Sequence, residues 1–167
     1  MVRKKPFGRA VILRDEERSN AMELTQLFDY DLWANRQWLA VLERSGFPEP
    51  DTSVFQHILS AQEIWLRRCR GHSPTEMPNP SVNEATLMQL NKDWKELLAA
   101  LDANPLIEYR RTTGEPNAAH LYAIARHVIN HGTYHRGELR GLKRAAADLD
   151  FPDTDLIGFV MQQGLRE

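Results

Sequence analysis

Apolar residues recur every three or four positions along four long segments of this chain. Such spacing places them on one face of an α-helix, with polar residues on the opposite face. The segments run from Glu23 to Arg44, from Asp51 to Arg70, from Asn83 to Ala100 and from Asn117 to Ala147. Four amphipathic helices of this length predict an all-α fold, a four-helix bundle whose apolar faces meet in one core.

Glycine and proline mark the ends of these helices. Gly46 with Pro48 and Pro50 ends the first helix, and Gly71 ends the second. Glycine adopts the left-handed conformation that often closes a helix, and proline cannot continue one. The stretch that follows Gly71, as far as Pro80, contains three prolines and is therefore predicted to be a loop.

The segments outside the four helices are predicted to be short or irregular. Residues 106–113 alternate weakly between apolar and polar and lead into Thr-Gly-Glu-Pro, which predicts an extended segment and a turn. A short helix is expected over residues 155–163. Residues 1–20 are highly charged and contain a Pro-Phe-Gly break, so we predict a flexible extension there, or alternatively an ordered strap along the bundle. Residues 21–167 then form one bundle domain.

Composition excludes several classes of protein. Twenty-one basic and 23 acidic residues give a formal charge of −2, which does not favour nucleic-acid binding driven by bulk charge. No apolar run approaches the roughly 18 residues that a membrane span needs. The single cysteine, Cys69, excludes an intrachain disulfide and suits a reducing compartment. We therefore expect a cytoplasmic protein that binds neither nucleic acid nor membrane, with Cys69 as a buried thiol.

Three of the six histidines lie four residues apart near the end of the fourth segment: His127, His131 and His135. Residues four apart stand on consecutive turns of one helix face, so their imidazoles can converge. Two imidazoles supply two ligands of a divalent-metal site, and the third must come from another helix. His57, on the second segment, is the candidate.

A helical wheel places three of these histidines toward the interior. His131 and His135 fall on either side of Ile124 within the apolar arc, and His57 falls within the arc of its own helix. Inward-facing side chains on facing helices are how bundles build metal sites, although hydrogen-bonded core histidines would give the same pattern. His127 lies at the edge of its arc and is expected to be a pocket group rather than a ligand. His72 and His120 are expected at the surface.

The sequence around these histidines resembles that of a known family. Residues 127–139 (HVINHGTYHRGEL), with the Thr-Gly-Glu-Pro turn before them and Pro-Asp-Thr-Asp-Leu-Ile after them, resemble the DinB family of the DinB/YfiT-like metalloenzyme superfamily. Residues 28–36 and 55–61 are similar to the first two helices of that family. The resemblance spans about residues 23–160. It implies a four-helix bundle that binds a divalent metal, commonly nickel or zinc, with the ligands on His57, His131 and His135.

The resemblance also implies an activity and an assembly. Superfamily members of known activity include thiol-dependent transferases and isomerases that use low-molecular-weight thiols such as bacillithiol or mycothiol. A small-molecule substrate with a thiol cosubstrate is therefore expected here. Pairing into a homodimer is also implied, and the third helix carries apolar residues that would serve either an interface or a monomer core: Leu87, Leu90, Trp94 and Leu101.

The expected chemistry follows from three neutral ligands, which leave a coordination position open, as in catalytic sites. A thiol bound there would lose its proton and become a nucleophile. Glu138, where the family commonly has glutamine, is placed to orient a ligand imidazole or to act as a base, although a surface salt bridge explains it equally well. His127 is the second candidate catalytic residue. Tyr30, Trp33 and Asn35 on the first helix are candidates to line the pocket.

Other functions remain open on the sequence alone. The metalloprotease motif His-Glu-x-x-His is absent, because Gly132 stands where its glutamate would be, and this lowers the case for a hydrolase. A metal- or ligand-binding protein without turnover, a metal-dependent hydrolase and a dimerising helical protein with a vestigial histidine cluster are the alternatives to a transferase.

Overall fold

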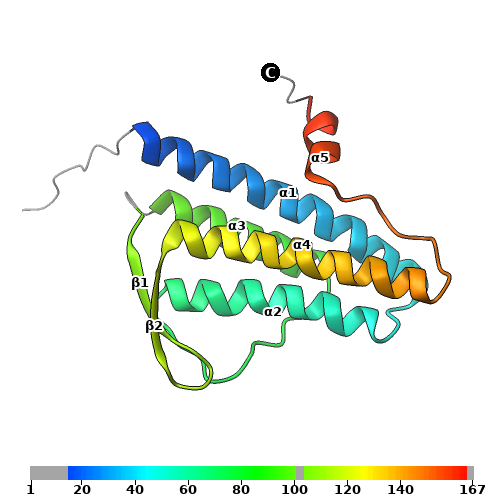
Figure 1. Cartoon of the computed structure of the whole chain (residues 1–167), viewed down its shortest axis with the longest axis horizontal. Coiled ribbons are helices and arrows are strands. Elements are labelled where there is room, and N and C mark those ends of the chain that lie inside the picture. Colours follow the sequence, from blue (N-terminus) through cyan, green and yellow to red (C-terminus); the bar gives the residue numbers. More distant parts are fainter. Residues whose placement is uncertain (1–14, 101–103, 165–167) are drawn as a thin grey trace, which may run out of the picture.

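The structure, a computed structural model, describes residues 15–100 and 104–164 and is mainly helical (Figure 1). Within these residues the elements are α1 (Asp15–Ser45), α2 (Asp51–Cys69), α3 (Glu84–Ala100), β1 (Leu106–Arg110), β2 (Pro116–His120), α4 (Leu121–Ala145) and α5 (Leu156–Gln162). The all-α prediction is confirmed for most of the described chain, and a two-stranded sheet adds to it.

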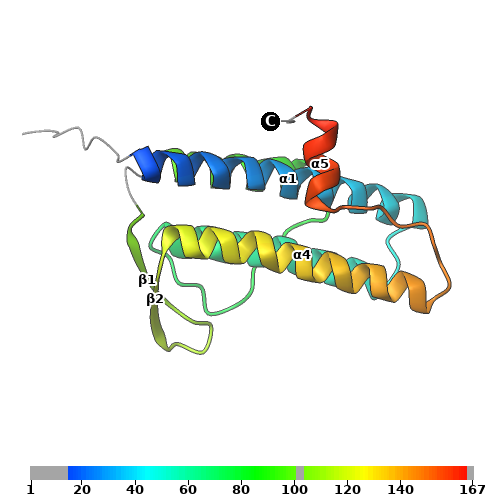
Figure 2. The same ribbon diagram turned by 45° about the horizontal axis from the view of Figure 1, so that its top comes forward.

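The four long helices lie side by side and share one core. Helix α1 packs against α3 and α4, and α2 packs against α4 and α3. Figure 2 shows α1 with α3 behind it above α4 with α2 behind it. The core contains large fully buried side chains from all four helices, including Trp38 and Phe55, and Phe28 stacks on Trp94 with ring centroids 4.9 Å apart. Burial of this apolar surface is the main stabilising contribution.

Helix α1 begins earlier than the sequence pattern predicts. It starts at Asp15, so residues 15–20 are helical and the extension expected over residues 1–20 is wrong for these six positions. Residues 1–14 lie outside the described chain. Residues 15–20 include no apolar residue, so periodicity gives no signal there, although acidic residues suit the first turn of a helix. The other end is as expected: Gly46, at φ 74°, follows the last helical residue.

The connection before α4 is a β-hairpin. Strands β1 and β2 pair antiparallel, with Leu106 opposite His120 and Arg110 opposite Pro116. The extended segment and its turn at Gly114 (φ 89°) were expected, but residues 117–120 were assigned to the fourth helix and form β2 instead. Asn-Ala-Ala-His carries little strand propensity, so the pairing with β1 decides its conformation.

After α4 the chain turns back toward α1, as Figure 2 shows, and α5 packs on α1. The Tyr30 hydroxyl donates a hydrogen bond to the backbone carbonyl of Thr154 at 2.8 Å. The Phe159 ring lies edge-on to Tyr30, with centroids 5.9 Å apart. These contacts hold the C-terminal segment against the helices, and the short helix expected over residues 155–163 is confirmed.

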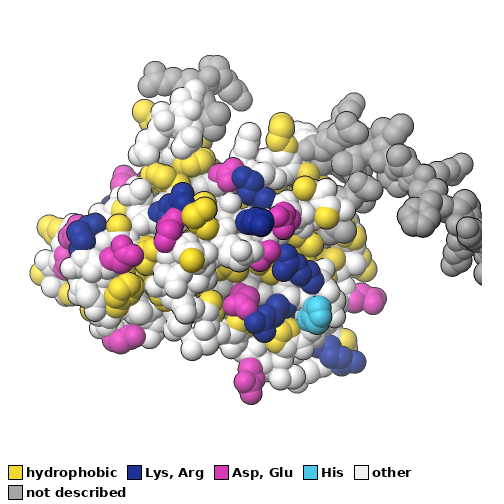
Figure 3. Space-filling view, turned by 180° about the vertical axis from the view of Figure 1, so that it is seen from behind, with side chains coloured by type: hydrophobic (Ala, Val, Ile, Leu, Met, Phe, Trp, Pro, Cys, Tyr) yellow, Lys and Arg dark blue, Asp and Glu magenta, His cyan; other side chains and the backbone are white. Residues whose placement is uncertain are grey.

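The apolar residues of α3 lie in the core of this chain. Leu87, Leu90 and Trp94 are at most 6% exposed, and Leu101 lies outside the described residues. These side chains therefore give no support to an interface, and the homodimer stays a prediction. The face shown in Figure 3 carries acidic and basic side chains intermixed. Among the described helices, none is long and apolar enough to cross a membrane.

Candidate metal centre

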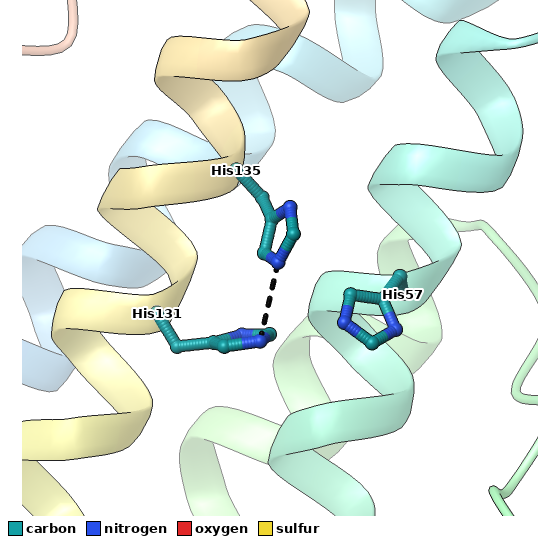
Figure 4. A group of neighbouring side chains, drawn as sticks. All are labelled: His57, His131 and His135. Atoms are coloured by element: carbon teal, nitrogen blue, oxygen red, sulfur yellow. Dashed lines mark hydrogen bonds between the residues drawn. The ribbon is translucent and has the colours of Figure 1, made fainter.

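Three histidines from two helices converge on one point. His57 comes from α2, and His131 and His135 come from consecutive turns of α4, which packs against α2 (Figure 4). Each ring offers one nitrogen, and these nitrogens all lie within 4.8 Å of one another. The same three residues were selected from the sequence, and the fold brings them together.

The spacing of the nitrogens suits a metal ion. Nε2 of His131 and Nε2 of His135 are 3.2 Å apart. Two ligand nitrogens that each lie about 2.0–2.1 Å from one ion are about 3 Å apart, depending on the coordination angle. The His57 ring completes the group, with its centroid 5.0 Å from that of His131 and 4.7 Å from that of His135. The His57 ring thus places a third imidazole nitrogen within 4.8 Å of the other two.

Glu138 binds the outer nitrogen of His135. Oε2 of Glu138 lies 2.7 Å from Nδ1 of His135, one turn along α4. An ionised carboxylate accepts hydrogen bonds only, so Nδ1 carries the proton and Nε2 of the neutral ring holds a lone pair that points into the cluster. Carboxylates commonly orient metal-binding histidines in this way. Of the two roles expected for Glu138, the contact favours orientation of His135.

The surroundings favour the neutral form of His131 and of His57. Burial, followed by the neighbouring His135, His57 and His127 rings, lowers the pKa of His131 to about 4. Burial also lowers the pKa of His57, with His135 adding to the shift and Glu138 opposing it. Neutral imidazoles coordinate metals and protonated ones do not. His131 and His57 thus present lone pairs at neutral pH.

The cluster lies nearer the surface than the helical wheel predicted. His57 is exposed, while His131 and His135 are partly buried. The expectation that all three face a closed interior is therefore wrong for His57. A wheel gives the direction of a side chain from its own helix axis, but it does not show how far the neighbouring helix covers that direction. Because His57 is exposed, solutes can reach the cluster.

His127 stands beside the cluster and not within it. Its ring centroid is 5.7 Å from that of His131 and 5.5 Å from that of Trp65, against which it packs edge-on. Burial lowers its pKa. His127 is thus an exposed imidazole next to the candidate ligands, and its role as a pocket group stays a prediction.

An aromatic wall extends from His127 along the seam of α2 and β1. Trp65 packs edge-on against Tyr109, with centroids 4.9 Å apart, and the Arg68 guanidinium lies 4.6 Å from the Trp65 ring centroid. Sequence reasoning missed these three residues. Trp65 follows His57 by two helical turns, which was a usable signal, whereas the position of Tyr109 depends on the hairpin.

The side chains of α1 that were expected in the pocket are engaged elsewhere. Asn35 hydrogen-bonds Asp31 and Arg136 in the interior. Tyr30 bonds the C-terminal segment, and Trp33 donates from Nε1 to Gln162 at 3.1 Å. Their assignment to the histidine site is therefore not supported.

Three further expectations concern residues away from the cluster. His72 and His120 are exposed, as predicted. Cys69 is a free, partly buried thiol, and burial raises its pKa to about 12. A thiol with so high a pKa is protonated at neutral pH and is a poor nucleophile.

The sequence matches a family model over most of its length. Residues 18–146 match the DinB family, and the matched region contains all three converging histidines. No curated protein gives a match. The match covers α2, α3, the hairpin, α4 and nearly all of α1, so it leaves no long helix unaccounted for, and the chain therefore belongs to the DinB family.

Proposed function

We propose that this protein binds one divalent metal ion through His57, His131 and His135 and catalyses thiol-dependent S-transfer to a small molecule. The supporting observation is the convergence of three imidazole nitrogens within 4.8 Å, with the His131 and His135 nitrogens 3.2 Å apart. Family membership adds to this support. We interpret the packing of α1–α4 as the four-helix bundle expected from the sequence, with the metal ligands on two of its helices.

The donor set favours nickel or zinc. Both ions accept imidazole nitrogen readily, whereas calcium and magnesium prefer oxygen. Three neutral ligands would leave the charge of the ion uncompensated and at least one coordination position open. That combination is typical of catalytic rather than structural sites. The exposure of His57 gives a substrate access to this position.

The residues around the cluster have separate roles in the proposed transfer reaction. A divalent ion held by the three histidines would lower the pKa of a coordinated thiol. With the ion bound, neutral His127 would accept the proton as the S–H bond breaks. The sulfur would then form a bond to the electrophilic carbon of the second substrate, and the leaving group would depart with the electron pair of the bond that breaks. Glu138 holds His135 in its ligand orientation throughout.

The aromatic wall supplies the remaining surface of the proposed site. Trp65 and Tyr109 offer flat apolar faces next to His127, and Arg68 brings a positive charge over both rings. Flat faces and one cation suit a small organic molecule with an acidic group. We propose that the electrophile is held there, within reach of the thiol sulfur.

Metal analysis tests the site. Protein purified without nickel affinity resin and without chelator is expected to contain about one divalent ion per chain. The His131→Ala and His135→Ala variants should each lose most of it, because two ligands hold an ion weakly. His72→Ala is the matched control and should retain it, since His72 is exposed in the loop after α2. Equal metal content in all these proteins would contradict the assignment.

Cobalt substitution tests the chemistry. A low-molecular-weight thiol that binds to the cobalt-loaded protein should produce a sulfur-to-metal charge-transfer band. His127→Asn should leave metal content and this band intact while slowing turnover, because it removes only the proton acceptor. If a panel of thiols leaves the spectrum of the cobalt protein unchanged, the S-transfer proposal is wrong. Metal-dependent hydrolysis and metal binding without turnover would then be the functions to test.

A further inference from the structure

A cavity of about 480 Å³ lies on the side of α4 that faces away from the histidine cluster. Its walls come from α1, from α4 and from residues 152–156, the segment that returns toward α1 in Figure 2. None of the three clustered histidines lines it. From α4 it takes Ile129, Thr133, Arg136 and Arg140, which alternate along the helix with the histidine positions. The two sites therefore share a helix but not a surface.

Arginine dominates the polar lining of this cavity. Arg126 approaches Glu23 at 3.9 Å, and Arg136 pairs with the buried Asp31 at 2.6 Å. Arg140 has no carboxylate within 4 Å among the described residues; its guanidinium lies 5.0 Å from the ring centroid of Phe151. Arg140 is therefore the cation of the cavity that lacks a counter-charge.

Two hydrogen-bond donors in this lining also lack acceptors. Nε of Arg136 and Nε of Arg140 are both buried, and neither has a partner in the part of the chain that the structure describes. Arg136 as a whole is only 2% exposed. Buried N–H groups without acceptors are costly, so a shift of either guanidinium that turned its Nε toward an acceptor on a ligand would stabilise the site.

The remaining walls define the rest of the ligand. Leu27, Trp38 and Ile129 give an apolar surface, and the volume lies within the range of small-molecule pockets. Asp155 also lines the cavity and is exposed. Its negative charge in the lining of the same cavity limits the net positive potential, which favours a singly charged carboxylate over a phosphate with two charges.

We propose that this cavity binds a small organic monocarboxylate, with its carboxylate at Arg140 and its apolar body between α1 and α4. A carboxylate accepts two hydrogen bonds from one guanidinium in a planar arrangement. The ligand also fills the space beneath residues 152–156. This site is separate from the proposed metal centre and does not depend on it.

Isothermal titration with decanoate at pH 7, in the presence of a chelator, tests the proposal. We expect saturable binding of one decanoate per chain, accompanied by a change in tryptophan fluorescence because Trp38 lines the cavity. Decanamide has the same chain without the charge and should bind at least about tenfold more weakly. Decyl phosphate should also bind more weakly than decanoate.

Three variants locate the binding site. Arg140→Gln should weaken decanoate binding about tenfold or more. Arg144→Gln is the matched control, because Arg144 also lies over Phe151 but does not line the cavity. Gly137→Phe should abolish binding by filling the cavity; a Cβ on Gly137 meets no atom within 4 Å, so this chain can still fold.

The outcomes that overturn the proposal are equally definite. They are no saturable binding of decanoate, equal binding of decanamide or decyl phosphate, equal losses in Arg140→Gln and Arg144→Gln, or full binding by Gly137→Phe. Decanoate binding should be unchanged in His131→Ala. Loss of binding in that variant would place the ligand at the histidine cluster instead.

Discussion

Helix α4 carries buried or half-buried polar side chains on two of its faces, and the two groups are built differently. Toward α2 it presents His131 and His135, which meet His57. Toward α1 it presents Arg136, which belongs to a buried ion-pair cluster with Asp31, Asn35 and Gln62. In this cluster Asp31 accepts hydrogen bonds from Arg136 at 2.6 Å, Gln62 at 2.7 Å and Asn35 at 2.9 Å.

The difference lies in how each group is compensated. The carboxylate of Asp31 and the guanidinium of Arg136 neutralise one another, and the amides of Asn35 and Gln62 take further hydrogen bonds, so the two charges of this cluster are paired internally. At the histidine cluster, neighbouring rings instead add to the lowering of the pKa of His131 and of His57, and no carboxylate of the described residues lies among the converging nitrogens. A buried cluster whose charges and hydrogen bonds are paired internally stabilises a fold. A cluster in which several nitrogen lone pairs converge without a cation is suited to bind one.

Breaking the buried ion-pair cluster should have the largest effect on the protein. We expect Arg136→Met to lower the free energy of unfolding by about 3–5 kcal/mol, because it leaves Asp31 buried without its counter-charge. Urea denaturation followed by circular dichroism measures this. Arg126→Met, which removes an arginine paired at 3.9 Å with an exposed glutamate, should cost about 1 kcal/mol or less. Similar losses in the two variants would show that the cluster has no special structural role.

A divalent metal ion should stabilise the folded protein, because the histidine cluster that binds it exists only in the folded state. Zinc at a hundred times its dissociation constant is expected to raise the free energy of unfolding by about 2.7 kcal/mol. His131→Ala should lose nearly all of this gain, because the unfolded chain and a two-ligand site bind the ion weakly. His72→Ala should keep it. A wild-type protein whose unfolding is unaffected by zinc or nickel would contradict the proposed metal centre.

The histidine site was predictable because its signal is local. The spacing of His131 and His135 by one helical turn is visible in the sequence, and only His57 had to come from a distant segment. The ion-pair cluster was not predicted, because it depends on contacts between residues far apart in sequence, such as Asp31 and Arg136. The one sequence feature that reflects the ion-pair cluster is the glycine at position 132. A Cβ on Gly132 would lie 2.8 Å from Oδ1 of Asp31, so this position has no room for a side chain.

The fold was predictable in outline for a similar reason. Periodicity of apolar residues reports helices that cover a core, and it located α2, α3 and most of α4 correctly. It failed at the polar start of α1, where no core contact leaves a pattern. It also failed at residues 117–120, where pairing with β1 overrides local preference. The exposed fraction of His57 depends on how the neighbouring helix packs against α2, and this packing cannot be predicted from the sequence of one segment.

Glu138 links the histidine site to the surface, and its removal should have a moderate effect. Glu138→Gln is expected to weaken metal binding about 10- to 100-fold, because a neutral amide holds and polarises His135 less strongly. Competition with a chromophoric chelator measures this. Glu96→Gln is the control, since Glu96 is exposed on α3 and its one ion pair among the described residues is with Lys92, at 3.7 Å. In a His135→Ala background the Glu138 substitution should add nothing, and an additive loss would contradict a role through His135.

The smallest expected effect concerns Lys143, which joins the ends of two helices. Nζ of Lys143 lies 2.9 Å from Asp148 and 3.4 Å from Asp51 at the start of α2. Lys143 is 4% exposed, but the Asp148 side chain is 42% exposed, so water screens this pair. We expect Lys143→Met to cost about 1 kcal/mol at pH 7. Lys92→Met, at an exposed pair, should cost less.

The pH dependence of that cost distinguishes ion pairing from packing. The hydrogen bond to Asp148, helped by Asp51 and opposed by burial, raises the pKa of Lys143 above its ordinary value of 10.5. The hydrogen bond from Lys143, followed by that from the Asp150 backbone, lowers the pKa of Asp148 below 3.8. The pairing therefore contributes its full stabilisation between the ordinary pKa values of the two groups, 3.8 and 10.5. This stabilisation is lost as the pH falls through the lowered pKa of Asp148 or rises through the raised pKa of Lys143. Urea denaturation should give a constant difference between wild type and Lys143→Met from pH 5 to pH 9, and a smaller one near pH 3. A difference that is unchanged near pH 3 would show that Lys143 acts through packing of its aliphatic chain alone.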